Sequence, residues 1–389
     1  MNKFRRLAFY FSLFTSVSLL AITLSACQPA PPSTPDMSAA LTQAFETAVA
    51  HLQPTATPIP SETPIPTATA VRTPPALPAT YVANQLNPLD IPHPYIQDTC
   101  QYLQDKWNSN NAAPGTVVMV VMFHGVDQER ASDVNDISVQ DFKKLMEDVK
   151  EQGFEAINAT QMADFVDHNA KIPPRSILLI SDDRHRGEYF NDHFRPYYEK
   201  WGWPVVNAWI SFEDGPRALS LESNIALEAE GWVDHQSHGY IHNINMSDSS
   251  TDEFIKTEFE KSISDLQQNF HKTPVAIIWP GGGFGIRPVQ FAREYGYRIG
   301  FTINPRGPVM YNWVPLADQR DPARPAYQPE GYVNDPRMVL PRYWPYQVQP
   351  NLDVVRNIGK DAAAYAEQNK ATELEYYDVM CAPTYGVIP

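Results

Sequence analysis

The hydrophobic pattern changes near residue 84 from scattered apolar positions to an alternation of short apolar runs and helical periodicities. Continuous apolar runs such as "TVVMVVMF" (116–123) and "RSILLIS" (175–181) are typical of strands that are buried on both faces. Further strands are expected at 205–210, 231–237, 275–279 and 298–303. At least five strand–helix alternations, with no internal repeat, predict an α/β domain built on a parallel sheet, open or closed into a barrel.

Helices are expected between these strands. The segment "SVQD" (138–141) is typical of a capping box, and Phe142, Leu145, Met146 and Val149 follow it at helical spacing before Gly153. A second helix is expected to carry its apolar residues at these positions: Phe254, Ile255, Phe259, Ile263 and Leu266.

The first 27 residues resemble a secretory signal. Lys3, Arg5 and Arg6 precede an apolar stretch that ends in "LSAC" (24–27), a sequence similar to a bacterial lipobox. In that interpretation Cys27 is lipidated and anchors an extracytoplasmic protein to a membrane; in the alternative, the signal is simply cleaved and Cys27 is incidental.

A Pro/Thr/Ala-rich segment follows the signal. Residues 28–82 are expected to form an extended tether, with one helical stretch at 37–52, and residues 83–389 to form the folded domain. Cys100 and Cys381 bracket this domain, and either a disulfide or two unpaired thiols is compatible with the sequence. The formal charge of −15 and pI near 5.1 argue against a nucleic-acid partner.

Polar residues gather where the expected strands end, which is where parallel α/β proteins carry their chemistry. His124 ends the first strand, Asp182 and Asp183 end the second, and "SHGYIH" (237–242) ends the fourth. Adjacent aspartates also suit a helix cap or a turn. Histidines four residues apart, however, lie on one face of a helical turn, and a carboxylate from another strand would complete a three-ligand metal site with an open position.

These segments resemble the polysaccharide deacetylase family, the NodB-type carbohydrate esterases, in an exported lipoprotein branch. "ISDDR" (180–184) is similar to the family's first motif, "SHGYIH" to its second and "WPGGG" (279–283) to its third, within a resemblance that spans about 117–342. The resemblance implies a distorted (β/α) barrel that holds one divalent metal, usually zinc.

The resemblance also implies site roles. Asp183, His238 and His242 would be metal ligands and Asp182 the general base, while backbone N–H groups near Pro280 and Gly281 would stabilise an oxyanion. No histidine follows His271, so His124, in "VMFHG", takes the general-acid position of the branch in which the last motif is moved to the first strand; alternatively it is a satisfied histidine at a strand end. His235 is expected to pack nearby rather than bind metal.

Some residues depart from the family pattern. Ile180 and Ser181 replace Thr-Phe, and the aromatic of the third motif is absent. Arg184 replaces a glycine and would put a cation at the mouth of the site, where it could either bind a substrate or obstruct it. Two functions follow. The first is a metal-dependent hydrolase that removes acetyl groups from an extracellular or cell-wall polysaccharide; the alternative is an inactive glycan-binding lipoprotein on the same fold.

Overall fold

The computed structural model describes residues 37–50, 72–127, 134–242 and 244–389. The chain divides into two compact units, residues 1–70 and 71–389. In the first unit, helix α1 (Met37–Ala50) occupies most of the expected helical stretch, whereas the signal segment and Cys27 lie outside the described residues. No helix in the described part of the chain combines the length and apolarity needed to cross a membrane.

A parallel sheet forms the centre of the second unit. Its strands run in the order β10-β9-β8-β7-β6-β2, and a short strand β5 also pairs with β6. All of these pairings are parallel. The bounds are β2 (Val117–Phe123), β5 (Glu155–Ala156), β6 (Arg175–Ser181), β7 (Val205–Trp209), β8 (Val233–Ser237), β9 (Ala276–Ile278) and β10 (Ile299–Phe301).

An irregular segment bridges the two edge strands of this sheet. Leu340 N donates to Gly300 O (2.8 Å) and its carbonyl accepts from Thr302 N (3.0 Å), beside β10. Tyr343 N donates to Val120 O (2.8 Å) and its carbonyl accepts from Met122 N (3.0 Å), beside β2. The sheet therefore curls, and residues 340–343 connect its edges, which confirms the expected distorted (β/α) barrel.

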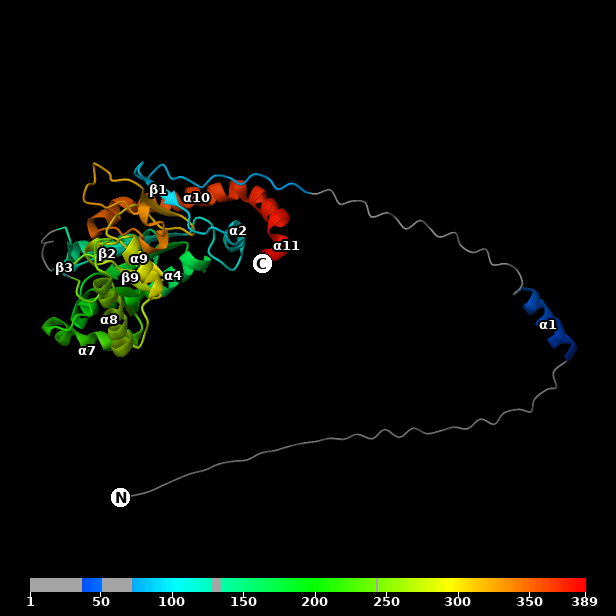
Figure 1. Ribbon diagram of the computed structural model, residues 1–389, viewed down its shortest axis with the longest axis horizontal. Helices are drawn as coiled ribbons and strands as arrows, with labels where there is room; N and C mark the ends of the chain where they lie inside the picture. The colour runs from blue at the N-terminus through cyan, green and yellow to red at the C-terminus, as the bar shows by residue number, and fades with distance from the viewer. Residues whose placement is uncertain (1–36, 51–71, 128–133, 243) are drawn as a thin grey trace, which may run out of the picture. The chain divides into compact units, whose positions relative to one another are not determined.

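Helices surround the curled sheet (Figure 1). Helix α3 begins as its sequence predicts: Ser138 Oγ accepts from Asp141 N (3.1 Å), and the four apolar residues are buried. The helices are α2 (Thr99–Trp107), α3 (Val139–Glu151), α4 (Ala159–His168), α5 (Gly187–His193), α6 (Arg195–Trp201), α7 (Gly215–Glu230), α8 (Asp252–Phe270), α9 (Ile286–Glu294), α10 (Pro345–Met380) and α11 (Ala382–Tyr385).

Short peripheral elements complete the domain. Strand β1 (Asp90–His93) pairs antiparallel with β11 (Val314–Ala317), and β3 (Gly125–Asp127) pairs parallel with β4 (Asp136–Ser138). Single 3-10 turns lie at Pro280–Gly282, Gly331–Val333 and Pro336–Met338.

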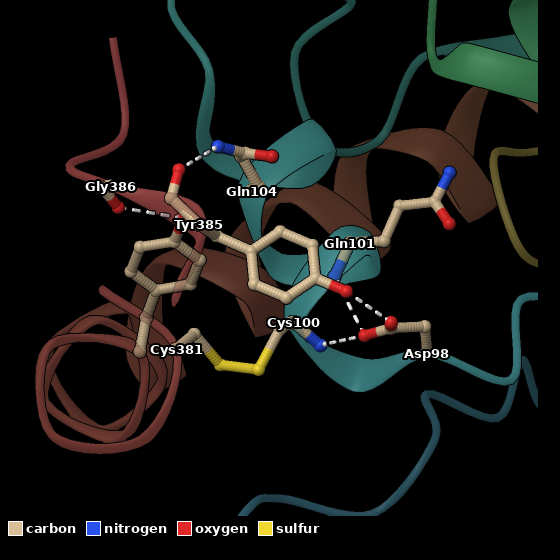
Figure 2. Close-up of a disulfide and its surroundings, with 8 residues drawn as sticks. Asp98, Cys100, Gln101, Gln104, Cys381, Tyr385 and Gly386 are labelled. Atoms are coloured by element: carbon tan, nitrogen blue, oxygen red, sulfur yellow. Dashed lines mark hydrogen bonds between the residues drawn. A yellow bond between two sulfur atoms is a disulfide. The ribbon is translucent and has the colours of Figure 1, made fainter. Parts of the chain in front are cut away.

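A disulfide links helix α2 to the end of α10. Figure 2 shows Cys100 of α2 bonded to Cys381, which directly follows α10. Beside it, the Tyr385 hydroxyl donates to Asp98, the residue that caps α2 by accepting from Cys100 N (2.9 Å). The structure thus selects the disulfide over the two free thiols.

The folded unit begins earlier than the expected boundary at residue 83. Arg72 forms an ion pair with Asp378 of α10. Ala79 O accepts from the Tyr365 hydroxyl (2.8 Å), and Tyr81 O accepts from Trp313 Nε1 (2.8 Å). Residues 72–82 are therefore part of the domain surface rather than of a free tether.

Candidate metal centre

The candidate residues converge at the carboxyl ends of the barrel strands. His124 directly follows β2, Asp182 and Asp183 follow β6, His238 follows β8, and Pro280 lies two residues beyond β9. Because these strands are parallel, their carboxyl ends meet at one face of the barrel.

Asp183, His238 and His242 lie together. One ligand atom from each residue falls within 4.8 Å of the other two. Asp183 Oδ1 is 3.8 Å from His238 Nε2 and 3.4 Å from His242 Nε2, and the imidazole centroids are 4.5 Å apart. Asp183 adopts a left-handed backbone conformation (φ 67°), which turns the chain immediately after the buried strand.

The protonation state of His238 leaves one ring nitrogen available to bind a cation. Its Nδ1 lies 2.8 Å from Ile278 O, and since a carbonyl only accepts, Nδ1 is the protonated nitrogen. The lone pair is then on Nε2, the atom that faces Asp183. Burial lowers the pKa of His238 to about 4, so the ring is neutral at physiological pH. Two imidazoles and a carboxylate match the donor set of catalytic zinc sites.

The spacing of His238 and His242 predicted that they share a helical turn. That prediction is wrong. Residues 239–242 form a loop in which Gly239 (φ 74°) and His242 (φ 68°) have left-handed backbones. The fully buried Glu258 of α8 accepts from Tyr240 N (2.7 Å) and Ile241 N (2.9 Å). That carboxylate, rather than helical hydrogen bonds, brings His242 back toward His238.

Asp182 is a buried carboxylate with a buried cationic partner. Arg342 Nη1 donates to Asp182 Oδ1 (2.5 Å), and Arg342 Nε donates to Thr302 O (2.7 Å). Burial alone would raise the pKa of Asp182, but the charge of Arg342, followed by those of His238 and His124, lowers it to about 2. The sequence interpretation did not find Arg342. It lies 160 residues away along the chain, and only the segment that bridges β10 and β2 brings it to the site.

His124 faces Asp182 from the neighbouring strand. Its Nε2 is 3.7 Å from Asp182 Oδ2, and its ring stacks on Trp344 with centroids 5.5 Å apart and planes at 11°. Within the described residues, His124 Nδ1 is buried and has no hydrogen-bond partner. Nε2 is therefore the nitrogen of His124 that is directed at the site.

Arg184 does not stand free at the mouth of the site. Its guanidinium donates to Phe212 O (2.9 Å) and Asp214 Oδ2 (3.0 Å), and its side chain is only 8% exposed. Asp214 is also the cap of α7, since it accepts from Arg217 N (2.8 Å). These contacts account for Arg184 without a substrate.

The third-motif segment forms a tight turn beside the triad. Gly281 has a left-handed backbone (φ 56°), and a Cβ there would lie 2.2 Å from Asn245 Oδ1, so the position favours glycine. Proline has no N–H. The backbone donor at this turn would therefore come from Gly281 and not from Pro280.

His235 lies apart from the triad in the barrel wall. It is fully buried, its Nδ1 and Nε2 are 2.8 Å from Glu228 Oε2 and 2.9 Å from Asn224 Oδ1, and its ring stacks on Phe270. Both ring nitrogens are thus already engaged, and neither is available as a metal ligand.

No protein with a curated description matches this chain. Among solved structures it is similar to the Streptococcus pyogenes deacetylase PplD in complex with acetate (17% identity, 63% of this chain and 99% of that chain covered, TM-score 0.49). It is also similar to IcaB from Ammonifex degensii (15% identity, 64% of this chain and 98% of that chain covered, TM-score 0.46). A third similar structure is a Bacillus cereus polysaccharide deacetylase (17% identity, 61% of this chain and 69% of that chain covered, TM-score 0.45).

The family model described as polysaccharide deacetylase matches residues 222–300, the segment that holds His238, His242 and the turn at Gly281. By this match, the segment that carries these residues is similar to the polysaccharide deacetylase family.

Proposed function

We propose that this protein is a metal-dependent hydrolase that removes acetyl groups from an extracellular or cell-wall polysaccharide. The observation that carries the proposal is one cluster at the barrel mouth. It combines a three-residue ligand set, a buried ionised carboxylate and a histidine that faces that carboxylate.

Asp183, His238 and His242 would hold one divalent cation, most simply Zn²⁺. Such a cation would supply positive charge that polarises an acetyl carbonyl and acidifies water. His238 is oriented for this role by its hydrogen bond to Ile278 O, and His242 by the loop that Glu258 fastens. Hydrogen bonds of this kind fix the ring orientation of a ligating histidine.

Asp182 would accept the proton of the attacking water. Its neighbour Arg342 keeps the carboxylate ionised and fixes Oδ1, which leaves Oδ2 on the side of His124. His124 would then donate a proton from Nε2 to the leaving nitrogen, so that one proton is taken up and one is delivered. The stacked indole of Trp344 holds the imidazole plane during this transfer.

The developing oxyanion would be stabilised by the Gly281 N–H together with the cation's charge. Arg184 has no part in this scheme, because its guanidinium is bound to Phe212 and Asp214. The replacement of a glycine by Arg184, one of the departures from the family pattern, is thereby accounted for.

We also place the enzyme outside the cytoplasm, anchored at Cys27. A disulfide between Cys100 and Cys381 suits an oxidising compartment, and the Pro/Thr-rich stretch after Cys27 suits a spacer between membrane and enzyme.

Acetate release from a panel of N-acetylated and O-acetylated glycans tests the proposal. The purified wild type should release acetate, Asp183→Ala should not, and Asp192→Ala, a change at an exposed aspartate of α5, should behave as wild type. If wild type releases no acetate from any glycan but binds them, the protein is the inactive glycan-binding lipoprotein instead.

A further inference from the structure

A second hollow lies at the opposite end of the barrel from the triad. It is a cavity of about 150 Å³ between α2, α10 and the segments 78–81 and 310–313. Thr116, which lines it, directly precedes β2, whereas His124 directly follows β2. Seven strand residues at about 3.3 Å each separate the two by roughly 20 Å or more, so the cavity is not part of the candidate metal centre.

Several aromatic side chains form part of the cavity wall. The Tyr102 and Tyr311 rings stack with centroids 6.0 Å apart. Tyr81 lies 6.1 Å from Trp313 and 5.6 Å from Tyr365. All five residues line the cavity, although they come from four separate parts of the chain.

The polar groups of the wall favour an uncharged ligand. Lys106 Nζ lies 2.7 Å from Glu373 Oε2, and with side chains 12% and 6% exposed the two charges compensate each other. The hydroxyls of Tyr102 and Thr116 form no hydrogen bond with other described residues, and burial raises the pKa of Tyr102, so its hydroxyl stays protonated. Neutral donors and acceptors are thus available to a ligand, whereas the charged groups are already paired.

The cavity continues into an open groove of about 410 Å³. Both hollows are lined by Lys106, Ala113, Pro114 and Ala366, and the groove runs on past Trp107 and Lys370. Together they are narrow and aromatic at one end and open at the other. This shape fits the end of a chain better than a compact ligand.

We propose that this cavity binds one pyranose ring of an uncharged glycan, with the following sugars along the groove. A cavity of about 150 Å³ accommodates a six-membered ring, as engineered cavities that bind benzene show. A sugar ring combines an apolar face for the tyrosines with hydroxyls for Tyr102 and Thr116. The inference is independent of the proposed hydrolase function.

Calorimetric titration of the full-length protein with N-acetylglucosamine tetrasaccharide and with cellotetraose tests the inference. The titration uses the His238→Ala background, which removes the candidate metal ligand. Ala113→Phe adds bulk at an exposed residue where cavity and groove meet, and should weaken binding by about tenfold or more. Ala364→Phe, the same change at an exposed residue of α10 that lines neither hollow, should leave binding unchanged.

Tyr102→Phe keeps the ring and removes one hydroxyl, so it should weaken binding by about two- to tenfold, the scale of one hydrogen bond. The inference is overturned if neither tetrasaccharide binds, or if Ala113→Phe binds as tightly as Ala364→Phe. A failure of acetate release would leave this result untouched, because the readout is binding at the far end of the barrel.

Discussion

At the scale of single residues, the site is a set of side chains whose protonation states are fixed by their neighbours. Ile278 O sets the tautomer of His238, and Arg342 keeps Asp182 ionised. Neither neighbour belongs to the motif that contains the residue it controls. The ligands and the base could be predicted because motif spacing marks them, whereas Arg342 and Trp344 could not, since only the folded chain brings them to β6 and β2.

The assignment of base and acid predicts the kinetics of two variants. Asp182→Asn and His124→Ala should each lower kcat by about 10²–10⁴-fold, the usual contribution of a positioned proton transfer. Neither residue is a proposed ligand, so metal content measured in parallel should match wild type. A His124→Ala enzyme with the wild-type rate on a confirmed substrate would show that another group protonates the leaving nitrogen.

At the scale of elements, the strands were predictable and the connections were not. The buried strands β2 and β6 are continuous apolar runs, and their observed bounds lie within one residue of those predicted. The helical turn expected at 238–242 is a loop, in which Gly239 and His242 have left-handed backbones and Glu258 accepts from Tyr240 N and Ile241 N. Residues 340–343 show no strand pattern, and their role as a bridge depends on hydrogen bonds to distant strands.

The contact between α10 and β2 depends on a glycine pair. Gly115 has φ 87°, and a Cβ there would lie 2.4 Å from Gly359 O of α10. Gly115→Ala should therefore lower the free energy of unfolding by about 1–3 kcal/mol or more, because strain and a backbone clash add together. Gly202→Ala is the control: φ is 74°, but no atom lies within 4 Å, so only the strain remains. Equal denaturation midpoints for the two variants would contradict this account of the contact.

At the scale of the whole molecule, the disulfide joins helix α2 to the residue that follows α10. Cys100 and Cys381 are separated by 281 residues, and the C-terminal Pro389 O accepts from Ser109 N (3.3 Å), just beyond α2. The cysteine positions in the sequence allowed this pairing but did not select it, because sequence carries no distance between the thiols.

Removal of this cross-link should destabilise the domain. Cys100→Ser/Cys381→Ser frees a very long loop in the unfolded state, which costs up to about 5 kcal/mol in the chain-entropy account. Urea denaturation should show a lower midpoint for the double variant than for the oxidised wild type, and wild type under reducing conditions should match the variant. An unchanged midpoint would mean that α2 and the end of α10 are held by packing alone.

Membrane attachment is a prediction for the entire chain. If Cys27 is lipidated, wild type should fractionate with membranes and Cys27→Ser should appear in the soluble extracytoplasmic fraction. A Cys27→Ser protein that still sediments with membranes as wild type does would exclude lipidation at Cys27 as the anchor.

The central claim, that Asp183, His238 and His242 form a metal centre, is tested most directly by the metal content of the purified full-length protein. Elemental analysis should find about one divalent ion, zinc foremost, per wild-type chain, and His238→Ala should lose it because two ligands hold a cation far more weakly than three. His168→Ala, a change at an exposed histidine of α4, should retain the ion. Metal content that is the same in His238→Ala as in wild type would contradict the account.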